Sequence, residues 1–112
     1  MGEFDKLIDM LNESGIPYER DDDNFMMLAF GTPVGGIKRI KYPKKEGFEC
    51  SVIFGKGTYG FESGELEIMG LLTPEEEACY SVAGYLTAEE VFNRISKHFK
   101  SIKKQAQEVE TE

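Results

Sequence analysis

The centre of the sequence reads FECSVIF over residues 48–54, and this stretch decides the fold. Apolar and polar residues alternate from Phe48 to Val52, and every second residue is apolar, so one face of an extended chain carries Phe48, Cys50, Val52 and Phe54. Alternation of this kind is typical of a β-strand with one buried face. Such a face must pack against another layer of structure. The stretch therefore predicts a half-buried strand.

Further short strands are predicted on both sides of this one. The runs of strand length and composition are residues 16–19, 25–30, 37–42, 66–72 and 82–86. Glycine, proline or acidic turns separate most of them, and the connections are short. Short connections favour antiparallel pairing, because a parallel crossover needs a dozen or more residues. The strands are therefore expected to follow one another in a meander-like sheet.

Two amphipathic helices are predicted outside the strands. The first has an apolar face at i, i+3, i+4 and i+7, formed by Phe4, Leu7, Ile8 and Leu11. The second opens at Thr87, which forms a capping box with Glu90. Its apolar residues from Val91 to Ala106 fall within about 100° of arc, while basic residues occupy the rest. Thr73 and Glu76 repeat the start of this pattern, but the apolar spacing then lapses, so only one helical turn is expected there.

These elements predict an α+β domain over residues 1–107, followed by a frayed acidic tail over 108–112. The fold class is an antiparallel sheet of four to six short strands with an N-terminal and a C-terminal helix. A length of 112 residues and 40% hydrophobic content suit one folded domain. The longest apolar run, residues 25–30, is far shorter than the ~20 residues of a membrane helix. Two cysteines and no signal-peptide pattern lead us to expect a cytoplasmic protein.

The charges of the chain are sorted into blocks. Residues 38–45 and residues 91–107 each carry five basic side chains and no acid, whereas the whole chain has a net charge of −8. Fields of both signs steer association with charged partners. The low pI of about 4.7 argues against direct nucleic-acid binding, because phosphate affinity comes from Lys and Arg. Pairing of the block 38–45 with Glu49, Glu65 or Glu67 on a neighbouring strand would explain it without any partner.

Acidic clusters are the predicted partner-binding residues. They are Asp21, Asp22, Asp23, Glu62, Glu65, Glu67, Glu75, Glu76 and Glu77. We expect them to dock on a Lys/Arg-rich groove of a protein partner, where charge complementarity sets the association rate and specificity. The alternative is a homodimer or larger homo-oligomer in which the basic helix of one copy meets the acidic surface of another. Calcium binding at residues 21–23 is disfavoured, because the twelve-residue loop with its Gly and terminal Glu is absent.

Two further patterns could carry chemistry. Residues 55–60 match G-x-G-x-x-G, but the sequence then leads into a strand instead of the helix that a dinucleotide site needs. A glycine-rich hairpin is the preferred interpretation. Cys50, Cys79 and His98 just reach the ligand count of a zinc site, although no C-x-x-C spacing supports it. No cofactor is the default prediction, with zinc as the alternative. No acid–base pair or nucleophile stands out, so an enzyme is not predicted.

The chain also resembles small proteins encoded by phages and prophages of Gram-positive bacteria. The resemblance lies in residues 66–76, in residues 84–92, and in the opening residues 4–8 with Gly15, Ile16 and Pro17. Small acidic phage proteins of this sort include anti-CRISPR inhibitors, which occupy basic surfaces that hold nucleic acid. The resemblance therefore implies an inhibitor of a host RNA-guided nuclease in the bacterial cytoplasm, and it assigns no functional residues.

Overall fold

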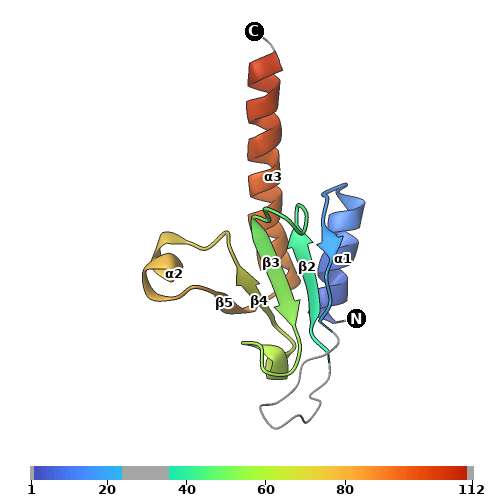
Figure 1. Cartoon of the computed structure of the whole chain (residues 1–112), viewed down its shortest axis with the longest axis vertical. Coiled ribbons are helices and arrows are strands. Elements are labelled where there is room, and N and C mark those ends of the chain that lie inside the picture. The colour runs from blue at the N-terminus through green and yellow to red at the C-terminus, as the bar shows by residue number, and fades with distance from the viewer. Residues whose placement is uncertain (1, 24–35, 111–112) are drawn as a thin grey trace.

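In the part of the chain that the structure describes, five antiparallel strands form one sheet, and two helices cover one of its faces (Figure 1). The computed structural model describes residues 2–23 and 36–110. Its elements in chain order are α1 (Glu3–Glu13), β1 (Glu19–Arg20), β2 (Lys38–Tyr42), β3 (Cys50–Phe54), the single 3₁₀ turn η1 (Phe61–Ser63), β4 (Leu66–Met69), α2 (Pro74–Cys79), β5 (Ala83–Leu86) and α3 (Ala88–Glu110).

The sheet is a meander with the spatial order β1-β2-β3-β4-β5. Every pair is antiparallel, and β2 and β3 share the longest register, with Ile40 opposite Val52 and Tyr42 opposite Cys50. This confirms the α+β prediction and the antiparallel pairing. The predicted strand over residues 25–30 lies outside the described residues.

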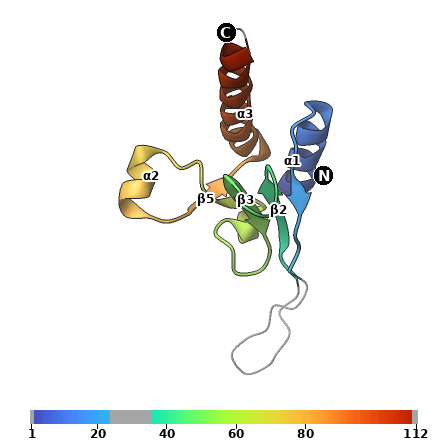
Figure 2. The ribbon, with the colours of Figure 1, turned by 45° about the horizontal axis from the view of Figure 1, so that its top comes forward.

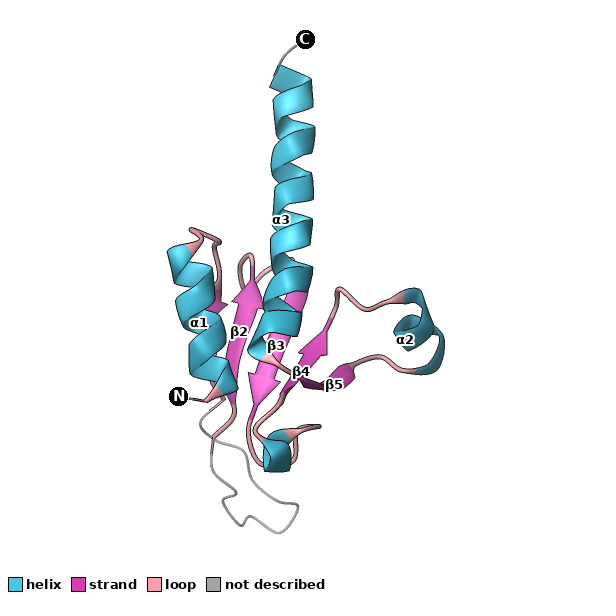
Figure 3. Ribbon diagram, turned by 180° about the vertical axis from the view of Figure 1, so that it is seen from behind, coloured by secondary structure: helices cyan, strands magenta, loops and turns pink. Residues whose placement is uncertain are grey.

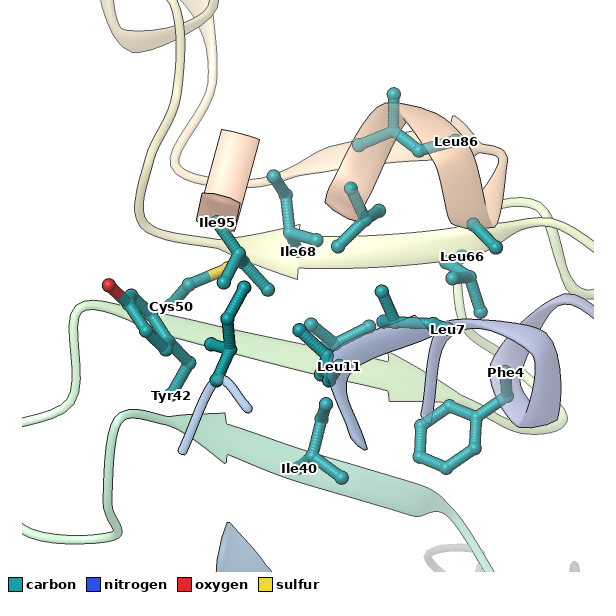
Figure 4. Close-up of a cluster of buried hydrophobic side chains, with 14 of the residues drawn as sticks. Phe4, Leu7, Leu11, Ile40, Tyr42, Cys50, Leu66, Ile68, Leu86 and Ile95 are labelled. Atoms are coloured by element: carbon teal, nitrogen blue, oxygen red, sulfur yellow. The ribbon is translucent and has the colours of Figure 1, made fainter. Parts of the chain in front are cut away.

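Both α1 and α3 pack on the same face of the sheet (Figure 3). The alternating strand residues that point to this face meet the apolar stripes of the two helices. Figure 4 shows this cluster of buried hydrophobic side chains. The largest fully buried side chains of the core are Leu7, Leu11, Ile40, Tyr42, Cys50, Val52, Leu66, Ile68, Val91 and Ile95. At ~25 cal/mol per Å² of buried apolar surface, this layer is the main stabilising contribution to the fold.

The opposite face of the sheet carries Arg39, Lys41, Ser51, Ile53, Glu67 and Met69. Together with Phe48 these side chains line a shallow hollow of about 230 Å³. The sequence pattern predicts that Phe48 shares the face of Cys50, Val52 and Phe54, and this part of the prediction is wrong. The strand begins only at Cys50, so the alternation of β3 does not extend to Phe48. The Phe48 ring instead lies under the Lys41 ammonium, 5.2 Å away.

Local signals explain where the strands and helices begin and end. Thr87 and Glu90 form the predicted reciprocal capping hydrogen bonds at the start of α3. Thr73 and Glu76 form the same motif before α2, which has six residues. The strand predicted over residues 66–72 ends at Met69, because Gly70 has φ 91° and turns the chain away from the sheet. Helix α3 continues to Glu110, beyond the predicted domain boundary at residue 107.

Candidate functional site

Three tyrosines with exposed rings gather beside the β4–β5 connection. Tyr59, Tyr80 and Tyr85 have 59%, 68% and 61% of their surface exposed. All three line one hollow of about 490 Å³, together with Glu76 and residues 82–84. Tyr59 and Tyr85 also line a second hollow of about 350 Å³, whose other wall is the glycine-rich segment 56–63. The two hollows therefore share an aromatic wall.

Backbone packing fixes Tyr59 and Tyr85 against each other. The Tyr85 amide donates a hydrogen bond to the Tyr59 carbonyl at 3.2 Å. At Gly84 a Cβ atom would lie 2.3 Å from the Tyr59 Cβ, so only glycine allows this approach. Gly60 lies close on the other side, where a Cβ would be 3.0 Å from the Tyr85 backbone. The segment before η1 and strand β5 are thus locked together by two glycines.

A buried carboxylate on β4 forms a hydrogen bond with the same segment. The Glu67 side chain is 9% exposed, and its Oε1 accepts a hydrogen bond from the Tyr59 amide at 2.8 Å. Thr58 closes the turn, because its hydroxyl donates to the Gly55 carbonyl at 2.8 Å. Phe61 packs its ring on Phe54 with centroids 5.0 Å apart. The position of Tyr59 is therefore determined by contacts on several sides.

Tyr85 has an unusual backbone conformation. Its φ is +60°, in the left-handed region that L-residues other than glycine, Asn and Asp rarely occupy. A strained residue of this kind costs on the order of 1–3 kcal/mol, and such residues are concentrated at functional sites. Because the Tyr85 ring is mostly exposed, core packing does not account for the choice of tyrosine over glycine here. The strained backbone therefore indicates a role for the exposed Tyr85 ring at the surface.

Helix α2, which carries the third tyrosine at its end, is tied to α3 by an ion pair. The Arg94 guanidinium binds both carboxylate oxygens of Glu76, at 2.7 and 3.0 Å, and also donates to the Leu71 carbonyl at 3.1 Å. Figure 2 shows α2 standing away from the sheet between its two connecting arms. Bidentate pairs of this type fix geometry as well as contributing energy. The contact therefore sets the position of Tyr80 relative to the sheet.

This ion pair predicts a specific dependence of stability on pH. Hydrogen bonds from Arg94, and then from the Thr73 amide, lower the pKa of Glu76 from 4.5 to about 2. A carboxylate with a lowered pKa stabilises the fold above its unfolded-state pKa, and this stabilisation is lost as the pH falls from 4.5 towards 2. Glutamine does not titrate, so Glu76→Gln should lose less unfolding free energy than the wild type as the pH falls. Because solvent screens the partly exposed pair, we expect this difference to be only about 1–2 kcal/mol. Urea unfolding at pH steps from 6 to 2 measures it.

Glu75→Gln is the matched control, because Glu75 is an exposed acid on the same helix, whereas Arg94 binds Glu76. Glutamine at position 76 can still serve the capping box. Equal slopes of unfolding free energy against pH in the wild type and Glu76→Gln would show that the pair does not stabilise the fold.

The structure places the predicted partner-binding acids in two different situations. Asp21 lies 3.0 Å from Lys41 and 3.4 Å from Arg39, and these contacts, first the Lys41 hydrogen bond, lower its pKa. Asp22 pairs with Arg20 at 2.8 Å. These acids, like Glu67 and Glu76, form contacts within the chain. The acids of the predicted set that lie on the surface near η1 and on α2 are Glu62, Glu65, Glu75 and Glu77.

The same contacts account for much of the basic block 38–45. Its side chains pair with the acids that follow β1, across the β1–β2 edge, and not with Glu49, Glu65 or Glu67 as the sequence suggested. The basic block is thus paired with acids of a neighbouring chain segment, as the sequence suggested, but the acid is Asp21. The predicted role of Asp23 in partner binding stays a prediction.

The candidate zinc ligands do not form a site. Among residues 2–23 and 36–110 no three His, Cys, Asp or Glu side chains are grouped so that they could hold a metal ion. Cys50 is buried in the core, and burial raises the pKa of its thiol to about 12. Cys79 is exposed at the end of α2. The His98 Nδ1 lies 2.8 Å from the Tyr42 hydroxyl in a hydrogen bond, so its role is to satisfy a buried tyrosine.

The G-x-G-x-x-G segment does not open a helix of the kind that binds a dinucleotide. It forms the turn between β3 and β4, and only the single turn η1 follows it. This agrees with the interpretation as a connection between two strands. The sequence patterns did not indicate the tyrosines, because Tyr59 and Tyr85 lie in segments whose clearest signals are their glycines and their strand pattern.

Comparison with known proteins does not assign the chain to a family. No family model, no curated protein and no solved structure matches the chain. Within the part of the chain that the structure describes, no helix combines the length and the apolar character needed to span a bilayer.

Proposed function

We propose that the protein is a protein-binding module and that the hollow around Tyr59, Tyr80 and Tyr85 is its docking site. The observation that carries this proposal is the exposure of three tyrosine rings around one hollow whose backbone is held rigidly. Tyrosine supplies a large amphipathic contact area at a low cost in side-chain entropy. It is among the residues enriched at the energetic centres of interfaces. A rigid docking surface also avoids the ordering cost of binding.

Charge around the hollow indicates the chemistry of the partner. Glu76 lines the larger hollow, where Arg94 pairs with it, and Glu62 and Lys56 line the smaller one. The segment of residues 46–90 as a whole carries ten acids against the single base Lys56. A partner surface rich in Lys and Arg would meet this field favourably, and its cations would stack on the tyrosine faces. Acids at the rim of such an interface raise the association rate more than the affinity. We therefore propose a basic protein surface as the partner.

A more specific form of this function is inhibition of a host RNA-guided nuclease. It is supported by the resemblance of the sequence to small phage proteins and by the acidic character of the segment that carries the hollow. A nuclease groove that holds nucleic acid is a basic surface of the required kind. In a cleavage assay with purified nucleases of Gram-positive hosts, the protein should suppress cleavage, and added salt should weaken the suppression.

Substitution of the tyrosines tests the docking site. We expect Tyr80→Ala to weaken binding about 30-fold, or about 2 kcal/mol, because it removes one aromatic anchor. Tyr85→Gly should weaken binding to a similar extent. Because glycine relieves the left-handed strain, the same variant should keep or raise the free energy of unfolding by up to about 1 kcal/mol. Partner capture from a bacterial lysate, followed by titration calorimetry with the purified partner, gives the affinities.

Met69→Ser is the control, because Met69 is an exposed apolar residue on the open face of the sheet, away from the tyrosines. It should bind with the wild-type affinity. If the tyrosine variants bind as well as the wild type, the hollow is not the docking site. If Tyr85→Gly lowers stability markedly, Tyr85 has a structural role that the exposed ring does not suggest.

A further inference from the structure

A groove lies between helix α3 and the chain segment that joins β4 to α2. Its volume of about 460 Å³ is within the range of small-molecule sites. One wall is apolar and is formed by Leu71, Leu72 and Pro74. The other wall is a polar stripe of α3, with the spacing i, i+3, i+4 and i+7, formed by Arg94, Lys97, His98 and Ser101. The groove therefore brings an apolar surface and a polar one together.

Contacts within the chain hold one end of the groove in place. Figure 3 shows the β4–α2 connection leaving the sheet beside α3. The Arg94 guanidinium, which binds both carboxylate oxygens of Glu76, also donates to the Leu71 carbonyl at 3.1 Å. Leu71 itself has φ +54°, in the left-handed region that bulky residues rarely adopt and that is more frequent at binding sites. The groove therefore has a defined shape next to the ion pair.

The polar wall carries donors that the protein leaves unpaired. Among the described side chains, no acid lies within ion-pair distance of Lys97, and the Ser101 hydroxyl has no hydrogen-bond partner. The acid nearest to this end, Glu76, is already bound by Arg94. The hydroxyl of Thr73, which also lines the groove, accepts the hydrogen bond of the α2 cap. One free positive charge therefore faces the groove.

His98 adds a further donor through its second ring nitrogen. The buried Tyr42 hydroxyl lies 2.8 Å from Nδ1 and has no other hydrogen-bond partner among the described residues. It therefore donates to Nδ1, which leaves the proton of the neutral ring on Nε2. The Glu49 carboxylate, which is exposed, lies 3.8 Å from Nε2, too far for a hydrogen bond. The Nε2–H group is thus available to a ligand.

We propose that this groove binds a small organic anion, namely a carboxylate with an apolar body. The single unpaired cation Lys97 matches a single negative charge, and the Ser101 hydroxyl and the His98 Nε2–H donate to the same head group. The apolar body would lie along the wall that begins at Leu71. For a ligand of this size we expect a dissociation constant on the order of 0.1–1 mM. The groove shares no lining residue with the tyrosine hollow, so the proposal does not depend on it.

Titration with sodium octanoate, followed by proton nuclear magnetic resonance at constant pH, tests the proposal. His98 is the only histidine of the chain, so its ring signals report on the groove directly. Octanoate should shift these signals and saturate on the order of 0.1–1 mM. Neutral octanamide and the short anion acetate should each bind about tenfold more weakly or worse. No shift up to about 20 mM octanoate, or equal binding of octanamide, overturns the proposal.

Two lysine variants locate the site. Lys97→Gln removes the unpaired charge from an exposed position, so it should weaken octanoate binding about tenfold without a change in the circular dichroism spectrum. Lys100→Gln is the matched control, because Lys100 is an exposed lysine on the same helix that does not line the groove. It should bind octanoate with the wild-type affinity. Wild-type affinity in Lys97→Gln, or an equal loss in both variants, would contradict a site at this groove.

Discussion

Substitution of Gly70 by alanine should destabilise the protein by about 4 kcal/mol, at the upper end of single-residue effects. Gly70 follows β4 with φ +91°, and a Cβ there would lie 2.0 Å from the Glu49 carbonyl oxygen. Both the contact and the strain involve backbone, which no side-chain rotation can relieve. Accommodation of the methyl group would have to move the start of β3 away from the end of β4, and these strands form the middle of the sheet.

Urea unfolding followed by far-ultraviolet circular dichroism measures this effect. Gly64→Ala is the matched control, because Gly64 has φ +76° but no atom within 4 Å of the position that an added Cβ would take. It should therefore show the cost of left-handed backbone alone, about 1 kcal/mol. The difference between the two variants isolates the steric clash. Equal losses would mean that the strands separate without cost, which the continuous register of β3 and β4 argues against.

Substitution of Gly84 by alanine should have the second largest effect, a loss of about 3 kcal/mol together with loss of partner binding. A Cβ at this position would be 2.3 Å from the Tyr59 Cβ and 2.9 Å from the Tyr59 carbonyl oxygen. That carbonyl accepts the hydrogen bond from the Tyr85 amide, so the methyl group would push the Tyr59 backbone away from Tyr85. The rigid hollow would no longer exist in its present form.

Gly57→Ala provides the comparison for Gly84. Gly57 lies in the same glycine-rich segment with φ +99°, and no atom lies within 4 Å of the added Cβ. Its backbone strain should lower stability by about 1 kcal/mol but leave binding intact. Nuclear magnetic resonance of the five tyrosines distinguishes the variants, because only Gly84→Ala should shift the ring signals of Tyr59 and Tyr85. A Gly84→Ala variant that binds normally would contradict the proposed docking site.

The fold was predictable from the sequence because its main signals are local. The alternation in residues 50–54 and the apolar face of α1 report directly on which side chains face the core. Thr87 and Glu90 identify the start of α3 through hydrogen bonds between residues three apart. The ends of strands were less predictable. The turn after Met69 depends on a backbone contact between Gly70 and Glu49, and nothing in the pattern of residues 66–72 reveals it.

The candidate site was less predictable because it depends on contacts between distant segments. Tyr59 and Tyr85 are 26 positions apart in the sequence, and they meet through the close approaches at Gly84 and Gly60 and through a backbone hydrogen bond. The sequence did show that acids surround them. It did not show which acids are already paired, since the contact of Glu76 with Arg94 joins two helices and that of Asp21 with Lys41 joins two chain segments at the sheet edge. Charge counting therefore overestimated the acidic surface that is free for a partner.

The hydrogen bond between Glu3 and the Ala88 amide joins residues 85 positions apart, and it has a consequence for the order of folding. Neighbouring strands of the sheet are also neighbours in the sequence, so their pairing closes short loops and can proceed early. Closure of α1 onto α3 forms the longest loop and must come later. During synthesis on the ribosome, the apolar faces of α1 and of the sheet stay without their cover until α3 has emerged. This part of the nascent chain is therefore most prone to aggregation just before α3 is complete.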